Sequence, residues 1–512
     1  MSGNVFECAF FYFMKTLKEI FEKIPGAQIF GDAEIRPSVL ITDSRRVVPG
    51  ALFFAMDGLQ TNGSLFAEDA VRRGAVAIVS RERLAFLPPE IAQVVVGNVS
   101  HAVAFAADVF FDFPTRALTL AGVTGTNGKT SVTSLVRYLL MRGAISRPWG
   151  LIGTVRYELG RRSIPSYKTT PESLDLISLF SEMRAADCAG AVMEVSSHAI
   201  DQNRVFGLPF KVVAFTNLTQ DHMDYHGNME SYFAVKSRLF DGSQGVFPEA
   251  AVVNADDFYG RRILENLPAQ TRAVPFGFAN ASVSEGGFFA RDIVYSSGGS
   301  EFELVCPAGT FAVKTALPGD YNVSNVLCAL AIVGSLGGDV ARAVRDLPDF
   351  SGVHGRMERV ANPFPFDVFV DYAHTDDALS NALGMLRRVA KGRVLAVFGC
   401  GGNRDRGKRP KMVRAVQEIA DFAWATSDNP RKEPIEQIFS DMRTGVLAPE
   451  KIEFVPDRRR AIALALDSAR AGDVVLIAGK GHETYQEFAD ITLPFDDCAV
   501  ARELLELRRH RA

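Results

Sequence analysis

The sequence lacks long hydrophobic runs, internal repeats, low-complexity tracts and any large basic block. No stretch approaches 18 consecutive apolar residues, so we expect no transmembrane helix and no membrane partner. Hydrophobic residues make up 47% and charged residues 23% of the chain, which is ordinary globular composition. The formal net charge is −4, so nucleic acid is not an implied partner.

Cysteine is scarce and scattered along the chain. The six cysteines form no CxxC pair and show no metal-ligand spacing (Cys8, Cys188, Cys306, Cys328, Cys400 and Cys498). This distribution suits a reducing compartment and argues against a structural zinc site. We therefore expect a cytoplasmic location.

The length of the chain predicts several domains. Its 512 residues are too many for one hydrophobic core, and about three domains is the natural expectation. We interpret residues 1–13 as an N-terminal extension, because Val5 to Phe13 is mostly apolar but short, has no basic residue before it and no small-residue cleavage site, and Met14 is a more natural start. The three domains are then predicted at residues 14–114, 115–352 and 353–512.

Short apolar strands alternate with helical patterns, which predicts an α/β fold with parallel sheets and crossover helices. The expected strands are Ala51–Phe54, Ala75–Val79, Ala191–Val195, Val212–Asn217, Asp367–Val370, Arg393–Phe398, Phe422–Ala425 and Asp473–Ala478. A turn-rich segment at about 276–316 is expected to form a β-hairpin insertion or a sheet flank. Ligands of such sheets sit beyond the carboxyl ends of the strands, and unusual polar residues of this chain cluster there.

The segment Ala117–Thr130, ALTLAGVTGTNGKT, is the most informative part of the chain. It predicts a strand, a Gly-rich turn and then an amphipathic helix, which is the arrangement of a phosphate-binding loop. Lys129 can reach the outer phosphates of a nucleotide, and the Thr130 hydroxyl can ligate Mg²⁺. The strict motif requires glycine at the position of Val123, so the pattern departs from it by one residue.

Two further polar segments follow strands in the central region. Glu194 ends an apolar strand, where a carboxylate is costly without a partner; Mg²⁺ is one candidate partner and a basic side chain is the other. Asp221, His222 and Asp224 form a possible metal-ligand group, with a loop hydrogen-bond network as the alternative.

The C-terminal region places charged loops after its strands. Gly399–Arg409 is Gly-rich and charged, and it is either an anion-binding loop or a solvated turn. Asp428–Arg431 and Gly479–Glu483 occupy equivalent positions. Several acidic and basic groups at one sheet edge suit a zwitterionic substrate that bears carboxylates, since arginine binds a carboxylate through two hydrogen bonds.

Together these motifs resemble the Mur ligase family of ATP-dependent amide-forming enzymes, in the right order and over nearly the whole chain. The matching motifs are Gly125–Thr130 (GTNGKT), Thr169–Glu172 (TTPE), Glu194–His198 (EVSSH), Asn217–Gly227 (NLTQDHMDYHG), Gly355–Glu358 (GRME), Asp371–His374 (DYAH) and Gly479–Glu483 (GKGHE). The resemblance implies a central P-loop ATPase domain, an N-terminal α/β domain that binds UDP and a Rossmann-like C-terminal domain.

Within the family, the resemblance is strongest to the ligases that add the third residue of the peptidoglycan stem peptide. It implies that the γ-carboxylate of UDP-MurNAc-L-Ala-D-Glu attacks the γ-phosphate of ATP, and that the amino group of meso-diaminopimelate then attacks the acyl phosphate. The cofactors implied are ATP and Mg²⁺, and the family suggests a monomer. A metal is expected on Thr130, Glu194, His222 and a carbamylated Lys236.

The resemblance also implies which residues contact each substrate. For ATP they are Gly125, Thr126, Asn127, Gly128, Lys129, Thr130, Asn322, Asn325, Arg356, Asp371 and His374. For the UDP-MurNAc-dipeptide they are Ser44, Thr169, Thr170, Ser196, Gln202 and Arg204. For diaminopimelate they are Arg404, Asp428, Asn429, Pro430, Arg431, Gly479 and Glu483. The implied catalytic residues are Lys129, Glu194, His222, Lys236 and Arg356.

Three alternative functions stay open. The first is the version of the ligase that adds L-lysine, against which Arg431 argues, because diaminopimelate carries a distal carboxylate that lysine lacks. A folylpolyglutamate synthetase would have no use for the first hundred residues or for Asp428–Arg431. An inactive P-loop ATPase is the third, and the presence of Lys129, Glu194, His222 and Lys236 argues against it.

Overall fold

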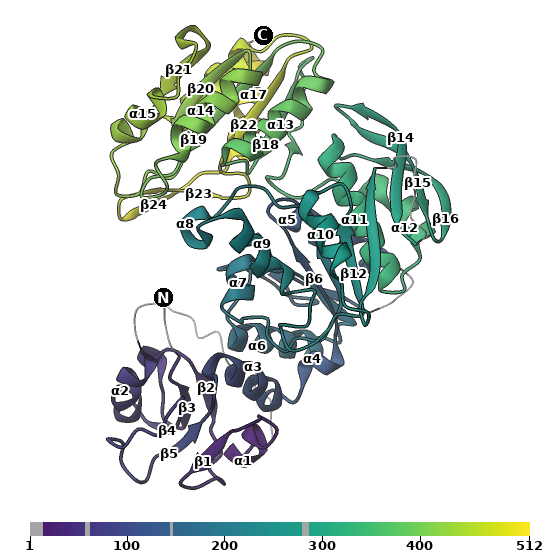
Figure 1. Ribbon diagram of the computed structural model, residues 1–512. Helices are drawn as coiled ribbons and strands as arrows, with labels where there is room; N and C mark the ends of the chain where they lie inside the picture. The colour runs from purple at the N-terminus through teal and green to yellow at the C-terminus, as the bar shows by residue number, and fades with distance from the viewer. Residues whose placement is uncertain (1–13, 57–61, 144–146, 279–285, 512) are drawn as a thin grey trace. The chain divides into compact units, whose positions relative to one another are not determined.

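The computed structural model describes residues 14–56, 62–143, 147–278 and 286–511 (Figure 1). The chain divides into two compact units. The first comprises the described residues of Met1–Gly122, Arg147–Val213 and Val235–Glu249, and the second those of Val123–Ser146, Ala214–Ala234 and Ala250–Ala512. The predicted boundaries near residues 114 and 352 stay a prediction. Among the described residues, no helix is long and apolar enough to cross a membrane.

The first sheet has five strands in the order β1-β5-β4-β3-β2. Its strands are β1 (Gln28–Phe30), β2 (Val39–Ile41), β3 (Ala51–Phe54), β4 (Ala75–Ser80) and β5 (Ala92–Val95). The accompanying helices are α1 (Leu17–Phe21), α2 (Ala67–Arg72) and α3 (Val99–Phe110). All neighbouring pairs are parallel except β1 with β5. The strands expected at Ala51–Phe54 and Ala75–Val79 are confirmed.

The second sheet has eleven strands in the order β16-β15-β14-β13-β12-β11-β6-β10-β7-β8-β9. Its strands are β6 (Thr119–Thr124), β7 (Trp149–Ile152), β8 (Arg156–Glu158), β9 (Ser163–Pro165), β10 (Gly190–Glu194), β11 (Phe210–Phe215), β12 (Ala250–Asn254), β13 (Arg272–Phe278), β14 (Phe288–Ser296), β15 (Gly299–Cys306) and β16 (Gly309–Thr315). The phosphate-loop strand β6 is therefore central. The last three strands pair antiparallel at one edge, which confirms the sheet flank expected at about 276–316.

Nine helices follow or connect these strands in the described part of the chain. They are α4 (Pro114–Ala117), α5 (Lys129–Arg142), α6 (Ser173–Ala185), α7 (Ser197–Asp201), α8 (Met223–His226), α9 (Met229–Ser237), α10 (Phe258–Glu265), α11 (Asp320–Ser335) and α12 (Val340–Asp346). α5 begins directly after the Gly-rich turn, as the sequence predicts, and buries Val132, Leu135, Val136 and Leu139 on one face.

The third sheet has six strands in the order β17-β18-β22-β19-β20-β21. Its strands are β17 (Glu358–Arg359), β18 (Asp367–Asp371), β19 (Val394–Cys400), β20 (Phe422–Ser427), β21 (Ile452–Val455) and β22 (Val474–Ala478), and a separate hairpin joins β23 (Tyr485–Phe488) to β24 (Ile491–Pro494). The helices are α13 (Asp376–Val389), α14 (Lys408–Ile419), α15 (Ile435–Arg443), α16 (Arg458–Ser468) and α17 (Asp497–Arg511). The first three contribute to one buried core, and α16 and α17 to another.

The register of this sheet brings four strand ends to one edge. Asp371 of β18 pairs with Ala478 of β22, and Cys400 of β19 pairs with Ser427 of β20. All of these strands run parallel, so the loops that follow them leave the sheet on the same side. The gathering of polar loops that the sequence predicts is thus a consequence of strand direction.

A fully buried ion pair holds the ends of two of these strands, where the following loops begin. The side chains of Arg458 and Asp497 are both 0% exposed, with two hydrogen bonds of 2.8 and 2.6 Å between them. The same guanidinium donates to the carbonyl oxygens of Ser427, at 3.4 Å, and Ala478, at 2.9 Å. These are the last residues of β20 and β22.

Replacing Arg458 with methionine is expected to lower the free energy of unfolding of this region by about 3–5 kcal/mol, because Asp497 would be left as a buried charge without its partner. Arg459→Met is the matched control. It removes the neighbouring pair with Glu503, whose side chains are 41% and 55% exposed, and should cost less than about 1 kcal/mol. Urea unfolding followed by Trp424 fluorescence, in a Trp149→Phe background, measures both variants. Equal losses would contradict the role given to burial.

Candidate functional site

The Gly-rich turn after β6 leaves no room for side chains at two of its positions. Gly125 has φ +148°, and a Cβ there would lie 1.9 Å from the Thr216 hydroxyl oxygen. Gly128 has φ +86°, and a Cβ there would lie 2.4 Å from the Asn325 amide oxygen. The turn therefore has the bare backbone that an anion cradle needs, at the N-terminus of α5.

The loop after β11 braces this turn from the side. The Thr216 hydroxyl donates to the Asn127 carbonyl at 2.6 Å, and the Asn217 side chain accepts from the Asn127 N–H at 2.9 Å. The Thr219 N–H donates to the Thr126 hydroxyl at 3.0 Å. The NLT segment of the NLTQDHMDYHG motif thus holds the phosphate turn in shape.

The remaining predicted nucleotide residues of the second unit lie around the turn. The Lys129 ammonium donates to the carbonyls of Gly125, at 2.9 Å, and Thr126, at 2.8 Å, so it folds back over the turn. Asn322 and Asn325, both buried on α11, are joined by a hydrogen bond of 3.4 Å. Thr130 is buried and accepts a hydrogen bond of 3.3 Å from Arg356.

Arg356 lies in a group of aromatic side chains. Its guanidinium lies 4.5 Å from the centre of the Tyr372 ring, and both the His374 and the His482 rings pack against the same tyrosine. Burial, with the Arg356 charge as the next cause, lowers the pKa of His482 to about 3. Burial, followed by the Lys408 charge, also lowers the pKa of His374. Arg356 therefore supplies the positive charge here, while both imidazoles stay neutral. The buried Nε of Arg356 has no hydrogen-bond partner among the described residues.

Backbone contacts join three of the motifs. A Cβ on Gly355 would lie 2.0 Å from the Gly481 carbonyl carbon, and one on Gly481 would lie 2.6 Å from the Tyr372 Cβ. The carboxylate of Asp371 accepts from the N–H groups of Met357, at 2.7 Å, and Ala373, at 2.9 Å. Asp371 thus organises the backbone of both the GRME and DYAH segments.

In the first unit, Glu194 is held by a threonine that sequence reasoning missed. Glu194 is 1% exposed, and its carboxylate accepts from the Thr154 N–H at 2.8 Å and the Thr154 hydroxyl at 3.0 Å. The Thr154 hydroxyl also lies 3.1 Å from that of Thr169. Gly153 allows this approach, because a Cβ there would lie 2.5 Å from the carboxylate.

The residues predicted for the UDP-sugar substrate form a second network of this unit. The Thr170 hydroxyl donates to the Glu194 carbonyl at 2.8 Å and accepts from the Ser196 N–H at 3.1 Å. Arg204 donates to the Thr170 carbonyl at 3.0 Å and to the Gln202 amide oxygen at 2.5 Å. Ser44 lies apart from this network along the chain, buried in a short 3₁₀ helix capped by Asp43.

The two remaining predicted metal ligands differ in exposure. Lys236, on α9, is 1% exposed. His222, in the second unit, has a side chain that is 47% exposed and a left-handed backbone with φ +54° at the start of α8. Its backbone N–H donates to the Asp221 carboxylate at 2.8 Å.

The predicted amino-acid loops meet at the carboxyl edge of the third sheet. Asn429 donates to the Glu483 carboxylate at 2.8 Å, and Lys480 donates to both Asn429 and Glu483 at 3.0 Å. Arg431 donates to the Gly402 carbonyl at 3.0 Å and pairs with Glu487 at 2.9 Å. Their neighbours are close as well, since a Cβ on Gly479 would lie 2.7 Å from the Asp428 carboxylate, and Pro430 lies between Asn429 and Arg431.

Two charges of the Gly399–Arg409 loop are committed to protein partners. Arg409 is 0% exposed and binds Glu433 and Asp441, each at 2.7 Å, and Arg406 pairs with Asp441 at 2.8 Å. Both arginines therefore already have carboxylate partners, and the anion-binding interpretation of the loop stays a prediction. Arg404 is exposed at the surface of the same loop.

The comparisons with known proteins agree with this arrangement. Residues 38–108 match the description "Mur ligase family, catalytic domain", residues 123–333 the Mur ligase middle domain, and residues 355–481 the "Mur ligase, glutamate ligase domain". A curated protein of Solibacter usitatus, named UDP-N-acetylmuramoyl-L-alanyl-D-glutamate--2,6-diaminopimelate ligase, is 45% identical over 93% of this chain and 94% of its own. The chain belongs to the Mur ligase family.

Further relatives carry the same name as the Solibacter protein. The Geobacillus thermodenitrificans protein is 43% identical to this Mur ligase over 96% of the chain and 100% of its own. A solved structure titled as a UDP-N-acetylmuramoyl-L-alanyl-D-glutamate--2,6-diaminopimelate ligase is 32% identical, with a TM-score of 0.70, and the match covers 97% of this chain and 100% of the other. Both the α/β fold and the recognised family are thus confirmed.

The structure places three further residues, which were not among the predicted site residues, in contact with predicted ones. Thr154 holds Glu194, and Tyr372 lies beneath Arg356. Asp377 accepts from Asn127, at 3.3 Å, and from Thr219, at 2.9 Å. Asp377 lies in the first turn of α13, where acidic residues are favoured, but its contacts with Asn127 and Thr219 depend on tertiary packing.

Substituting Gly125 with alanine is expected to weaken ATP binding by roughly 5- to 150-fold, since a strained backbone position costs on the order of 1–3 kcal/mol. The new Cβ would push against Thr216 and deform the turn. Gly384→Ala in α13 is the control, because nothing lies within 4 Å of its Cβ, and it should leave ATP affinity unchanged. Calorimetric titration of ATP measures both. Full affinity in the Gly125 variant would refute the cradle described here.

Proposed function

We propose that this chain forms the amide bond between meso-2,6-diaminopimelate and the D-Glu γ-carboxylate of UDP-MurNAc-L-Ala-D-Glu, with ATP converted to ADP and phosphate. The reaction belongs to peptidoglycan precursor synthesis. The observation that supports it most is the 45% identity over 93% of the chain to a relative of that name, together with the intact phosphate turn. We further propose that the enzyme acts as a monomer in the cytoplasm.

The first chemical step is phosphoryl transfer. The substrate carboxylate attacks the γ-phosphorus of ATP, the bond to the β–γ bridging oxygen breaks, and an acyl phosphate and ADP result. There is little covalent chemistry for the protein to perform in such a step, so positioning and charge neutralisation dominate. We assign these roles to the backbone N–H groups of Gly125–Thr130, to Lys129 and to Arg356.

The second step is aminolysis. An uncharged amino group of diaminopimelate attacks the acyl carbon, inorganic phosphate leaves and the new amide loses a proton. We assign the orientation of the incoming amino acid to Arg404, the Asp428–Arg431 loop, Gly479 and Glu483. Glu483 and Asn429 are already linked through Lys480, which gives this loop pair a fixed geometry before substrate arrives.

The nucleotide and metal residues fit the groups assigned to them. The bare turn at Gly125 and Gly128 and the unpartnered Nε of Arg356 suit a polyphosphate. We propose that Thr130, Glu194, His222 and a carbamylated Lys236 hold Mg²⁺, which when bound neutralises charge on the transferring phosphoryl group. Carboxylate and carbamate oxygens are ligands that Mg²⁺ prefers. Lys236 is 1% exposed, so a carbamate at this position would be shielded from solvent.

The proposed reaction is tested by phosphate release with ATP, Mg²⁺ and UDP-MurNAc-L-Ala-D-Glu, with diaminopimelate or L-lysine added in parallel. Release and tripeptide formation that depend on diaminopimelate support the proposal. Release with lysine would retain the ligase and reject the amino-acid assignment. Phosphate release that is independent of both amino acids would favour the ATPase alternative.

Replacing Lys236 with arginine is expected to lower the rate of tripeptide formation by roughly 100-fold or more, the scale of losing one transition-state stabiliser. Arginine keeps the positive charge and does not form the carbamate. With ¹³C-bicarbonate, the unaltered enzyme should show a carbamate carbon signal that Lys236→Arg lacks. Lys211→Arg is the control, because it makes the same exchange at a lysine of strand β11 and should leave the carbamate signal in place. A carbamate signal that persists without Lys236 would refute the assignment.

Replacing Arg431 with leucine is expected to raise the KM for diaminopimelate about 10- to 150-fold, because a hydrogen bond to a charged group contributes about 1.5–3 kcal/mol. The KM for ATP should stay within about twofold if the loss is confined to the amino-acid site. Lys432→Ala is the matched control, since that side chain is 73% exposed beside Arg431. An unchanged KM for diaminopimelate would remove Arg431 from its recognition.

A further inference from the structure

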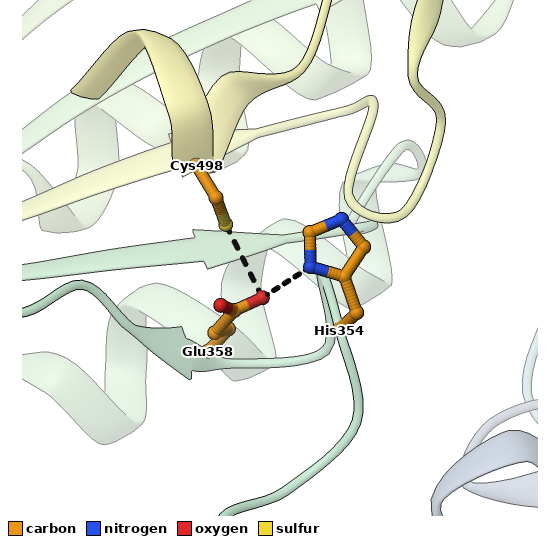
Figure 2. A group of neighbouring side chains, drawn as sticks. All are labelled: His354, Glu358 and Cys498. Atoms are coloured by element: carbon orange, nitrogen blue, oxygen red, sulfur yellow. Dashed lines mark hydrogen bonds and ion pairs between the residues drawn. The ribbon is translucent and has the colours of Figure 1, made fainter. Parts of the chain in front are cut away.

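Three potential metal-ligating side chains meet at the end of the GRME segment, and none of them is among the site residues assigned above (Figure 2). His354 precedes β17, Glu358 is the first residue of β17, and Cys498 lies in the first turn of α17. The His354 Nδ1 lies 2.7 Å from the Glu358 carboxylate, and the Cys498 thiol donates to the same oxygen at 3.2 Å. All three ligand atoms lie within 4.8 Å of one another.

We propose that His354, Glu358 and Cys498 bind a soft divalent cation of the Zn²⁺ class. Imidazole nitrogen, thiolate sulfur and carboxylate oxygen are the donors that Zn²⁺ takes in proteins, at about 2.0–2.3 Å in a tetrahedral arrangement. Such bond lengths place the donors roughly 3.3–3.8 Å apart. The observed separations of 2.7 and 3.2 Å therefore need to widen by less than about 1 Å.

The surroundings of His354 support this assignment. Its other ring nitrogen, Nε2, lies 3.3 Å from the Asp496 carboxylate. A carboxylate on the second nitrogen fixes the tautomer and the ring orientation, as is usual for histidines that bind metals. The alternative is a hydrogen-bonded cluster without a metal, because Glu358 also accepts from the Gly355 N–H, at 2.9 Å, and from Arg502, at 3.0 Å.

The charges around the cluster balance when a divalent cation is added. Glu358, Asp496 and a Cys498 thiolate carry three negative charges, and Arg502 and the cation carry three positive ones. Binding displaces the thiol proton of Cys498, so the affinity should rise with pH. Cys498 is 0% exposed, so the sulfur ligand would lie in a protected position.

Bound metal would restrain the segment that contains Arg356. His354 and Glu358 flank Gly355, Arg356 and Met357 in the chain, and Cys498 anchors them to α17. The same segment contacts the Gly481 backbone and Thr130. The cation would thus stabilise a segment that contacts the phosphate turn, without itself contacting substrate.

The test uses the reduced, metal-free full chain, with millimolar Mg²⁺ present to occupy sites made of oxygen ligands. Zn²⁺ is titrated against a chromophoric chelator, and Co²⁺ is added separately to reveal a thiolate-to-cobalt charge-transfer band. We expect one ion per chain with that band, and an affinity at least tenfold lower in Cys498→Ser and in His354→Gln. Cys306→Ser is the matched control, because that thiol is half-buried outside the cluster and should not affect binding.

Either of two results would overturn the proposal. One is a Zn²⁺ affinity that is the same in Cys498→Ser, His354→Gln and the unaltered chain, which would place the ion elsewhere. The other is a Co²⁺ complex without a thiolate band, which would leave the hydrogen-bonded cluster as the correct reading. His354 has a side chain that is 37% exposed on a loop, so His354→Gln decides the question even if Cys498→Ser fails to fold.

Discussion

The phosphate turn requires the backbone at Gly125 and Gly128 to pass so close to Thr216 and Asn325 that no side chain fits between them. Much of the second unit is arranged around this constraint. In the loop after β11, Thr216, Asn217 and Thr219 form hydrogen bonds with the turn. Helix α11 contributes the buried Asn322 and Asn325. A backbone held this tightly presents its N–H groups in a fixed geometry, which is what a polyphosphate binds.

Electrostatics divides the roles among neighbouring motifs. Around Tyr372, burial keeps His374 and His482 neutral, so that Arg356 can act as a positive charge in a weakly polar setting. At the edge of the third sheet, in contrast, Arg431 and Lys480 each already have a carboxylate partner. Under the proposed assignment, an incoming amino acid with two carboxylates and two ammonium groups would exchange partners with these existing ion pairs and would not bring charge into an empty apolar pocket.

Much of the fold could be predicted from the sequence, because its strands are short apolar runs bounded by glycine and polar residues. Strands such as Ala51–Phe54 and Phe422–Ala425 were expected within a few residues of where they lie, and so was the helix after Lys129. The motif residues around the phosphate turn also lie together. The individual roles of the predicted site residues stay predictions.

Other contacts could not be predicted, because they join residues that lie far apart in the sequence and belong to no common motif. Thr154, which hydrogen-bonds to Glu194, lies forty residues before it in the chain. Arg406 and Arg409 form ion pairs with Glu433 and Asp441, which lie later in the chain. Cysteine spacing argued against structural zinc, yet the fold places Cys498 beside a histidine and a glutamate more than 130 residues earlier. Spacing rules detect sites built within one segment, whereas this cluster joins two.

The buried Arg458 has a consequence for how substrate preference can change. Its guanidinium holds the last carbonyls of β20 and β22, so the points where the two amino-acid loops begin are fixed by the core. The residues beyond those points, from Asp428 to Arg431, can then vary in side chain without moving the frame that presents them. If this loop selects the amino acid as proposed, substitutions within it would change the diamino acid that binds, while the Arg458 ion pair and the phosphate turn would keep their residues.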